Sequence, residues 1–129
     1  MNENEIKQII SETVATTVLQ LRAAGLLQDN KKSAYEKTEE LLRQYPELCK
    51  VDEPYAQRVV QEIDACLAEA ANDPFVGVIR LFYFEGNKNA ACAAIMCYDD
   101  RTLRRNRRRL VEQFSTRLAS DDFIRELLL

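Results

Sequence analysis

Six arginines lie within nine consecutive positions, from Arg101 to Arg109, in the stretch DDRTLRRNRRRL. A guanidinium keeps its positive charge at all relevant pH values and offers a planar fork of five N–H donors, which suits phosphates and the guanine edge. The whole chain carries 18 basic and 21 acidic side chains, a formal net charge of -3. The chemistry predicted for this stretch is therefore binding of an anionic partner.

A helix would sort these arginines onto one side. At about 100° per residue, with Leu103 facing the core, Leu110 and Phe114 point in nearly the same direction. Arg107 falls about 40° from that direction, so we expect its stem to lie along apolar surface and its head to reach solvent. No row of Glu four residues earlier neutralises the others, and they are expected to project outward as one surface: Arg101, Arg104, Arg105, Arg108 and Arg109.

Other chemistries find little support in the composition. The chain has no histidine, and its four cysteines are not spaced as CxxC pairs, which argues against a zinc site. Carboxylates, lysines and thiols form no recognisable catalytic constellation, so we expect no enzyme and no cofactor. Cys66 and Cys92 stand among alanines and aliphatic residues and are predicted to pack in the core.

Charge is distributed unevenly along the chain. Residues 1–75 carry 8 basic and 14 acidic side chains, whereas residues 76–118 carry 9 basic and 4 acidic ones. The acidic balance of the whole chain therefore hides a basic module between acidic flanks. No run approaches the roughly 20 apolar residues of a membrane span, and the polar start MNENEIKQ is unlike a signal peptide, so we expect a cytoplasmic protein without membrane contact.

Apolar residues recur at helical spacing in most of the chain, which predicts an all-α fold. Helices are expected over 4–24, from a Ser33 cap to a break at Tyr45-Pro46, from Pro54 to Ala71, and from Asp73-Pro74 to Gly86. The last segment, FVGVIRLFYFEG, has the β-branched and aromatic content of a strand, but its Asp-Pro start, terminal glycine and length favour a buried helix. Its aromatic residues are expected to pack in the core rather than to form a stacking surface.

The C-terminal part predicts a helix-turn-helix. A short helix over 87–96 is followed by a break at Cys97-Tyr98 and by a helix capped by Asp99, with the apolar seam Leu103, Leu110, Phe114 and Leu118. Ser120-Asp121-Asp122 then opens a short final helix. We expect an N-terminal helical region over 1–72 packed on a DNA-binding domain over 73–129.

The helix-turn-helix geometry gives the charged residues different roles. The N-terminal turns of the second helix face base edges in the DNA major groove, and positions further along meet phosphates. The residues expected to face the groove are Asp100, Arg101, Arg104 and Arg105, and those expected to contact phosphates are Arg108 and Arg109.

The run FYFEG followed by NKNAACAAIMCYDDRTLRRNRRRL resembles the ArpU-like transcriptional regulators of phages and prophages, whose helix-turn-helix is similar to the C-terminal domain of sigma factors. In that pattern Cys92-Ala93 fill the aliphatic-alanine pair, Met96 the aliphatic site, Asp99 the cap and Arg101 to Arg105 the start of the recognition helix. Cys97 stands where the family has a turn glycine. The resemblance implies a sequence-specific DNA-binding regulator of transcription.

Several alternatives stay open. The arginine helix could be a solvated surface, or it could bind RNA, although aromatic platforms and Gly-rich loops are missing. The protein could be a helical adaptor or a phage DNA-packaging subunit that holds DNA or protein without regulating transcription. The apolar end, Leu127 to Leu129, either packs on the preceding helix or contacts a second copy in a homodimer. The acidic N-terminal helices either complete the core or contact RNA polymerase or another partner in a phage gene-expression complex.

Overall fold

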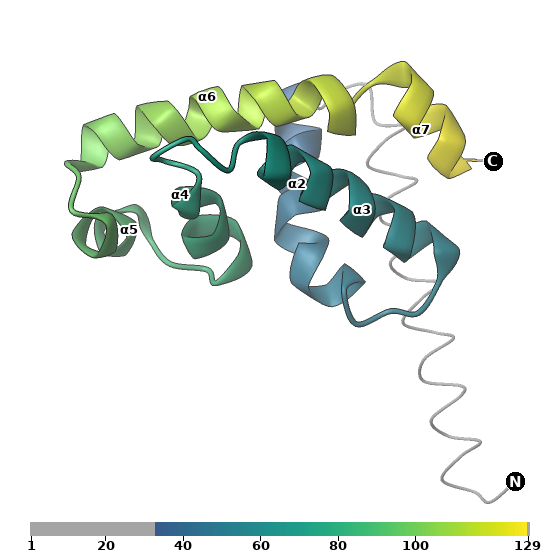
Figure 1. The fold of residues 1–129 in the computed structure, drawn as a ribbon, viewed down its shortest axis with the longest axis horizontal. Coiled ribbons are helices and arrows are strands. Elements are labelled where there is room, and N and C mark those ends of the chain that lie inside the picture. Colours follow the sequence, from purple (N-terminus) through teal and green to yellow (C-terminus); the bar gives the residue numbers. More distant parts are fainter. Residues whose placement is uncertain (1–32, 129) are drawn as a thin grey trace, which may run out of the picture.

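The computed structural model describes residues 33–128, and every regular element in that part of the chain is helical (Figure 1). The all-α prediction is therefore confirmed there, while the helix expected over 4–24 lies outside the described residues. No helix between residues 33 and 128 has the length and apolarity needed to cross a bilayer. In chain order the elements are α2 (Ala34–Leu48), α3 (Pro54–Glu69), α4 (Gly77–Ile79), the π-helical turn η1 (Arg80–Phe84), α5 (Asn89–Met96), α6 (Asp100–Leu118) and α7 (Asp121–Leu128).

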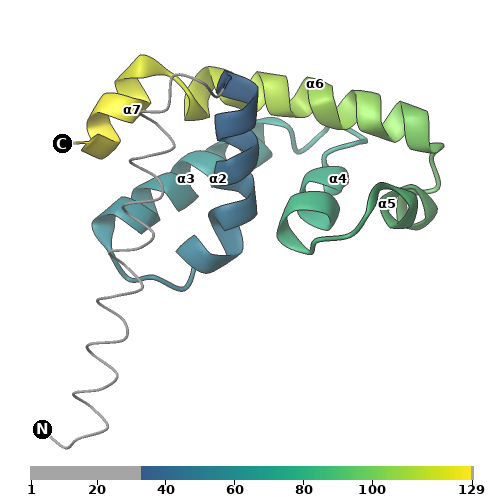
Figure 2. The same cartoon turned by 180° about the vertical axis from the view of Figure 1, so that it is seen from behind.

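Helix α6 is the element on which the others assemble. It has 19 residues and contacts α2, α3, α4, α5 and α7. In Figure 1 it runs along the top of the molecule with α3 and α4 beneath it, and Figure 2 shows α2 rising against it on the other side. The predicted seam is confirmed and gains Val111, so that the buried face of α6 consists of Leu103, Leu110, Val111, Phe114 and Leu118.

The core crosses the boundary predicted at residue 72. Leu41 of α2 and Ile63 of α3 belong to the same buried cluster as Ile79 and Leu110 from the C-terminal part. Among the described residues, the two predicted parts therefore share one core. Cys66 and Cys92, at 2% and 0% exposure, also belong to it, which confirms their predicted packing role.

Three helix starts follow the predicted capping chemistry. Ser33, Asp99 and Ser120 each accept a hydrogen bond from the backbone N–H three residues later, at 3.1, 3.3 and 3.2 Å. Each bond satisfies one of the N–H groups that a helix leaves without an internal partner. Local sequence therefore determines where α2, α6 and α7 begin.

The predicted break at Tyr45-Pro46 is wrong, because α2 continues through Pro46 to Leu48. A proline removes one helical hydrogen bond and disfavours the helical conformation of the residue before it. Tertiary contacts offset this cost: Tyr45 stacks on Phe84 with ring centres 4.3 Å apart and donates to Asp64 at 2.6 Å, and Leu48 is only 1% exposed. Packing of the last turn of α2 therefore outweighs the local preference.

The helix predicted between Asp73 and Gly86 is shorter and wider than expected. Regular helix begins only at Gly77 and passes at Arg80 into a π-helical turn, closed by the bond from the Glu85 N–H to the Arg80 carbonyl at 2.9 Å. Gly86 has φ +74°, which confirms the glycine stop. The helix predicted to end at Ala71 likewise ends earlier, at Glu69.

Tertiary contacts fix the directions of the aromatic side chains in η1. Tyr83 is 4% exposed and its hydroxyl donates to Glu39 of α2 at 2.7 Å, while Phe84 stacks on α2. Burial and the hydrogen bond to Glu39 raise the pKa of Tyr83 far above its ordinary value. The prediction that these rings serve the core is confirmed. Hydrophobic periodicity could not predict the π-helical turn, because the residues of α2 that contact Tyr83 and Phe84 lie about 40 positions away in the chain.

Candidate nucleic-acid interface

A tight turn of three residues joins α5 to α6. Cys97 adopts the left-handed conformation, φ 60° and ψ 36°, as expected for the position of the turn glycine. The Tyr98 N–H donates to the Ala93 carbonyl at 3.2 Å, which closes the end of α5 in a Schellman-type arrangement. Figure 1 shows α5 end-on below the N-terminal end of α6, which lies across the picture, so the two helices are steeply inclined to each other.

The outer face of α6 is less uniform than predicted. Four of the six arginines are exposed, namely Arg101, Arg104, Arg105 and Arg108, whereas Arg107 and Arg109 are half-buried. The expectation of five outward guanidiniums therefore holds for four. The difference arises from contacts with segments outside α6.

Arg109 is held by the segment before α4. Its guanidinium donates to Asp73 at 2.8 Å and to Asn106 at 3.3 Å. Partial burial alone would raise the pKa of Asp73, but the Phe75 N–H and Arg109 together hold that pKa below its ordinary value. Arg109 thus ties α6 to the loop after α3, and a phosphate contact at Arg109 would require this ion pair to open.

Arg107 differs from the expectation of a head that reaches solvent. Its guanidinium carbon lies 3.7 Å from the centre of the Phe82 ring, and Nη1 donates to Asn89 at the start of α5. Nε is enclosed without a partner among the described residues. Arg107 therefore joins α6 to both η1 and α5 and helps to set how α5 and α6 lie against each other.

Two exposed arginines form ion pairs within α6. Arg104 donates to Asp100 four residues earlier, so a single acidic residue at that spacing compensates one arginine, although no row of Glu does. Arg108 pairs with Glu112 at 3.2 Å and its guanidinium lies 5.3 Å from the centre of the Tyr35 ring in α2. Exposed helical pairs of this kind contribute about 0.3–0.5 kcal/mol, so a phosphate can compete for either arginine.

Arg101 and Arg105 carry the least compensated charge on the outer face. Arg101 is exposed and has no ion pair or hydrogen bond of its side chain with another described residue. Arg105 is exposed as well. The pKa of Asp99 is held below its ordinary value chiefly by the hydrogen bond with Thr102, and the charge of Arg105 makes only a small contribution to that lowering. The N-terminal half of α6 therefore presents two guanidiniums that are available to an anion.

Two features of the interface were not predicted from the sequence: the contact of Tyr35 with Arg108 and the exposure of Ile95 and Tyr98. Tyr35 lies 73 positions before Arg108, so nothing in the spacing indicated their contact. Ile95 and Tyr98 are the large apolar side chains that stay exposed in the described part, at 58% and 38%. Ile95 lies in the last turn of α5, and Tyr98 lies in the turn that joins α5 to α6. The short, alanine-rich α5 defines no clear apolar period, which is why the sequence did not single out Ile95.

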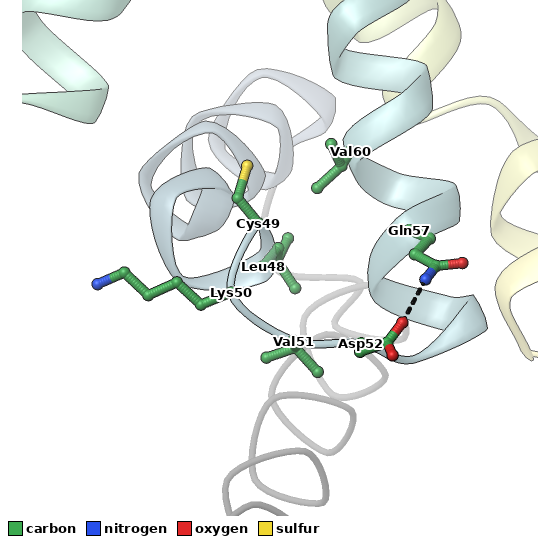
Figure 3. A pocket seen from close by; sticks show the side chains of 7 residues that line it. All are labelled: Leu48, Cys49, Lys50, Val51, Asp52, Gln57 and Val60. Atoms are coloured by element: carbon green, nitrogen blue, oxygen red, sulfur yellow. Dashed lines mark hydrogen bonds between the residues drawn. The ribbon is translucent and has the colours of Figure 1, made fainter.

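A shallow hollow of about 180 Å³ lies elsewhere, at the loop between α2 and α3 (Figure 3). The only hydrogen bond drawn among its lining side chains is the one from Gln57 to Asp52 at 2.7 Å. Within residues 33–128 no group of three or more Cys, Asp or Glu side chains is arranged to hold a metal ion. The lining consists of Leu48, Cys49, Lys50, Val51, Asp52, Gln57 and Val60.

Comparison of the chain with protein-family models, curated proteins and solved structures found no match. The resemblance to ArpU-like regulators therefore stays a prediction.

Proposed function

We propose that the protein is a sequence-specific, double-stranded DNA-binding regulator of transcription, of phage or prophage type, that inserts α6 into the major groove. The observation that carries the proposal is the exposed charge of Arg101 and Arg105, the least compensated on the outer face, on the first turns of a helix that follows a tight turn. The major groove is wide enough for one α-helix, and the first turns of such a helix reach base edges. The ArpU-like pattern in the same residues supports this proposal.

The arginines of α6 have different roles according to their position along the helix. Arg101, Arg104 and Arg105, with Asp100, face base edges, and Arg108 meets a phosphate further along the groove. Arg107 and Arg109 hold the helix in place through Phe82 and Asp73. The proposal needs no cofactor and places the protein in the cytoplasm, where its target DNA lies.

The test is binding of the full chain to fluorescent duplexes across a salt series. A duplex library with a random central segment first yields the preferred sequence, and a scrambled duplex of equal length serves as reference. We expect the preferred duplex to keep its advantage as salt rises, because base contacts depend on salt less than phosphate contacts do. Equal affinities for the two duplexes, or a ratio that falls to one as salt rises, would contradict sequence-specific binding.

Matched variants locate the surface. Arg101→Ala and Arg105→Ala should weaken binding to the preferred duplex, whereas Arg125→Ala, which removes an exposed charge of the same kind from α7, should leave binding unchanged. If Arg125→Ala weakens binding as much as the other two, net charge rather than α6 determines the affinity.

A helical adaptor is the second candidate, favoured by the exposed apolar side chains of Ile95 and Tyr98. Such a protein would bind a partner, for instance RNA polymerase, a packaging protein or a second copy, through α5. Ile95→Ser should abolish that association and leave the affinity of the isolated chain for DNA intact.

A further inference from the structure

We propose that Asp100 is a positioning residue that determines sequence specificity: its carboxylate holds the Arg104 guanidinium for reading a guanine and discourages its capture by phosphates. The inference rests on the proposed function. It assigns a base type to one arginine and a selective role to an acidic residue that otherwise opposes DNA binding.

The geometry of the pair favours one direction of the guanidinium. Asp100 is the first residue of α6, and its Oδ2 accepts a hydrogen bond from Nη2 of Arg104 one turn later. Its other oxygen, Oδ1, is enclosed and accepts no hydrogen bond from the described residues. The Asp100 side chain is 39% exposed and that of Arg104 is 57% exposed. The carboxylate is thus partly enclosed by the protein, and most of the arginine side chain stays accessible.

The order of the two residues reinforces the pair. An acidic residue four positions before a basic one is the favourable orientation on a helix, because the carboxylate lies nearer the positive end of the helix dipole. The same carboxylate raises the pKa of Arg104 further above its ordinary value. The pair therefore favours one direction of the Arg104 side chain without fixing it.

The chemistry of the groove explains what this arrangement can select. A guanidinium has five N–H groups, and the bond to Asp100 leaves enough donors to reach both O6 and N7 of guanine. A free arginine at this position would pair with any phosphate within reach. With Asp100 beside it, the local charge is close to zero, so the attraction to phosphates falls while the directional bonds to guanine remain.

The second helical pair of α6 provides a matched control. Arg108 and Glu112 have the opposite order, lie in the middle of the helix, and are more exposed, at 71% and 58%. The Arg108 guanidinium also lies over the Tyr35 ring. Removing the charge of Glu112 should therefore strengthen binding to all duplexes by the same factor.

The experiment uses the full chain and a duplex library with a random central segment. Four proteins are compared: wild type, Asp100→Asn, Glu112→Gln and Arg104→Ala. Each is used to select duplexes from the library, and each is then titrated with the duplex that wild type prefers and with its scrambled counterpart. Circular dichroism melts of the four proteins show that each is folded before its binding is compared. The readout is the base preference at each position and the ratio of the two affinities.

We expect Arg104→Ala to lose the preference for guanine at one position, with a ratio reduced about 5- to 150-fold, the range of a bidentate base contact. Asp100→Asn should weaken the preference at that same position and bind the scrambled duplex more tightly than wild type does. Glu112→Gln should leave the ratio and every position unchanged.

Two results would overturn the inference while leaving the proposed function intact. In the first, Asp100→Asn raises both affinities equally, as Glu112→Gln does. In the second, the position that depends on Arg104 prefers a base other than guanine. If instead wild type selects no sequence at all, sequence-specific binding fails, and the inference fails with it.

Discussion

The guanidinium of Arg107 lies over the Phe82 ring, with its carbon 3.7 Å from the ring centre, and this contact fastens α6 to η1. Arg107 is thereby separated in function from its neighbours, although all six arginines look alike in the sequence. A cation over an aromatic face contributes about 0.5–2 kcal/mol, and the arginine stem adds buried apolar surface.

Arg107→Ala should therefore lower the free energy of unfolding by about 1–2 kcal/mol, measured by urea denaturation. The control is Arg105→Ala, whose exposed side chain contacts little, so that its effect should stay within about 0.5 kcal/mol. Equal losses in the two variants would show that the stacked contact contributes nothing of its own.

Cys97→Gly should stabilise the protein. Cys97 has φ 60°, and this left-handed conformation costs a residue with a side chain roughly 1–2 kcal/mol. Glycine avoids that cost, but its greater conformational freedom in the unfolded state offsets part of the gain in stability. We expect a gain of up to about 1 kcal/mol, seen as a higher melting temperature. Cys49→Gly is the matched control, because Cys49 is also exposed but has φ -63°, where glycine relieves no strain and should be neutral or destabilising. A lower melting temperature for Cys97→Gly would contradict the prediction.

Stability should fall in acid through Glu62. Its carboxylate accepts from Arg58 at 2.5 Å and from Arg117 at 2.7 Å, which joins α3 to α6. Burial alone would raise the pKa of Glu62, but the two arginines hold it below its ordinary value of 4.5. Because the folded value is the lower one, the stabilisation is present above pH 4.5 and is lost as pH falls through the folded pKa.

Glu62→Gln should thus cost about 1–3 kcal/mol near neutral pH and reduce the loss of stability between about pH 5 and pH 3. Urea titrations at both ends of that range provide the measurement. Glu47→Gln is the control, since Glu47 and Lys50 form an exposed pair at 3.7 Å that should contribute almost nothing. An unchanged pH profile in Glu62→Gln would mean that other carboxylates carry the acid sensitivity.

Arg109 and Asp73 should be coupled in stability. Their side chains are 40% and 19% exposed, so the pair is partly shielded from water. A double-mutant cycle of Arg109→Ala and Asp73→Asn should give a coupling of about 0.5–1 kcal/mol. The same cycle on Arg104→Ala and Asp100→Asn, whose side chains are more exposed, should give a smaller coupling. A coupling near zero for the first pair would leave Arg109 available to DNA.

Arg108→Ala should weaken binding to every duplex by a similar factor and reduce the slope of log affinity against log salt by about 0.9, the value of one phosphate contact. Arg104→Ala and Arg105→Ala should instead cost about 1–3 kcal/mol on the preferred duplex and relax its specificity. Fluorescence anisotropy across a salt series separates the two behaviours. If the three variants behave alike, the division into base and phosphate contacts is wrong.

Local features of the sequence predicted much of the fold. Ser33, Asp99 and Ser120 carry oxygens that bond to a backbone N–H three residues later, and this chemistry needs no distant partner. The spacing of Leu103, Leu110 and Phe114 likewise determines which face of α6 is buried. Cys97 was recognisable as the turn position because its neighbours fit a helix end followed by a helix start.

The sequence by itself thus determined where α2, α6 and α7 begin, the buried seam of α6 and the density of positive charge on it. Only the tertiary structure decided which arginines stay available, because Asp73 and Phe82 reach Arg109 and Arg107 from segments more than 20 residues away. It also decided that α2 passes through Pro46 and that the turn at Arg80 is π-helical. Caps and periodicity act within one or two helical turns, whereas ion pairs and ring contacts depend on which distant segments the shared core brings together.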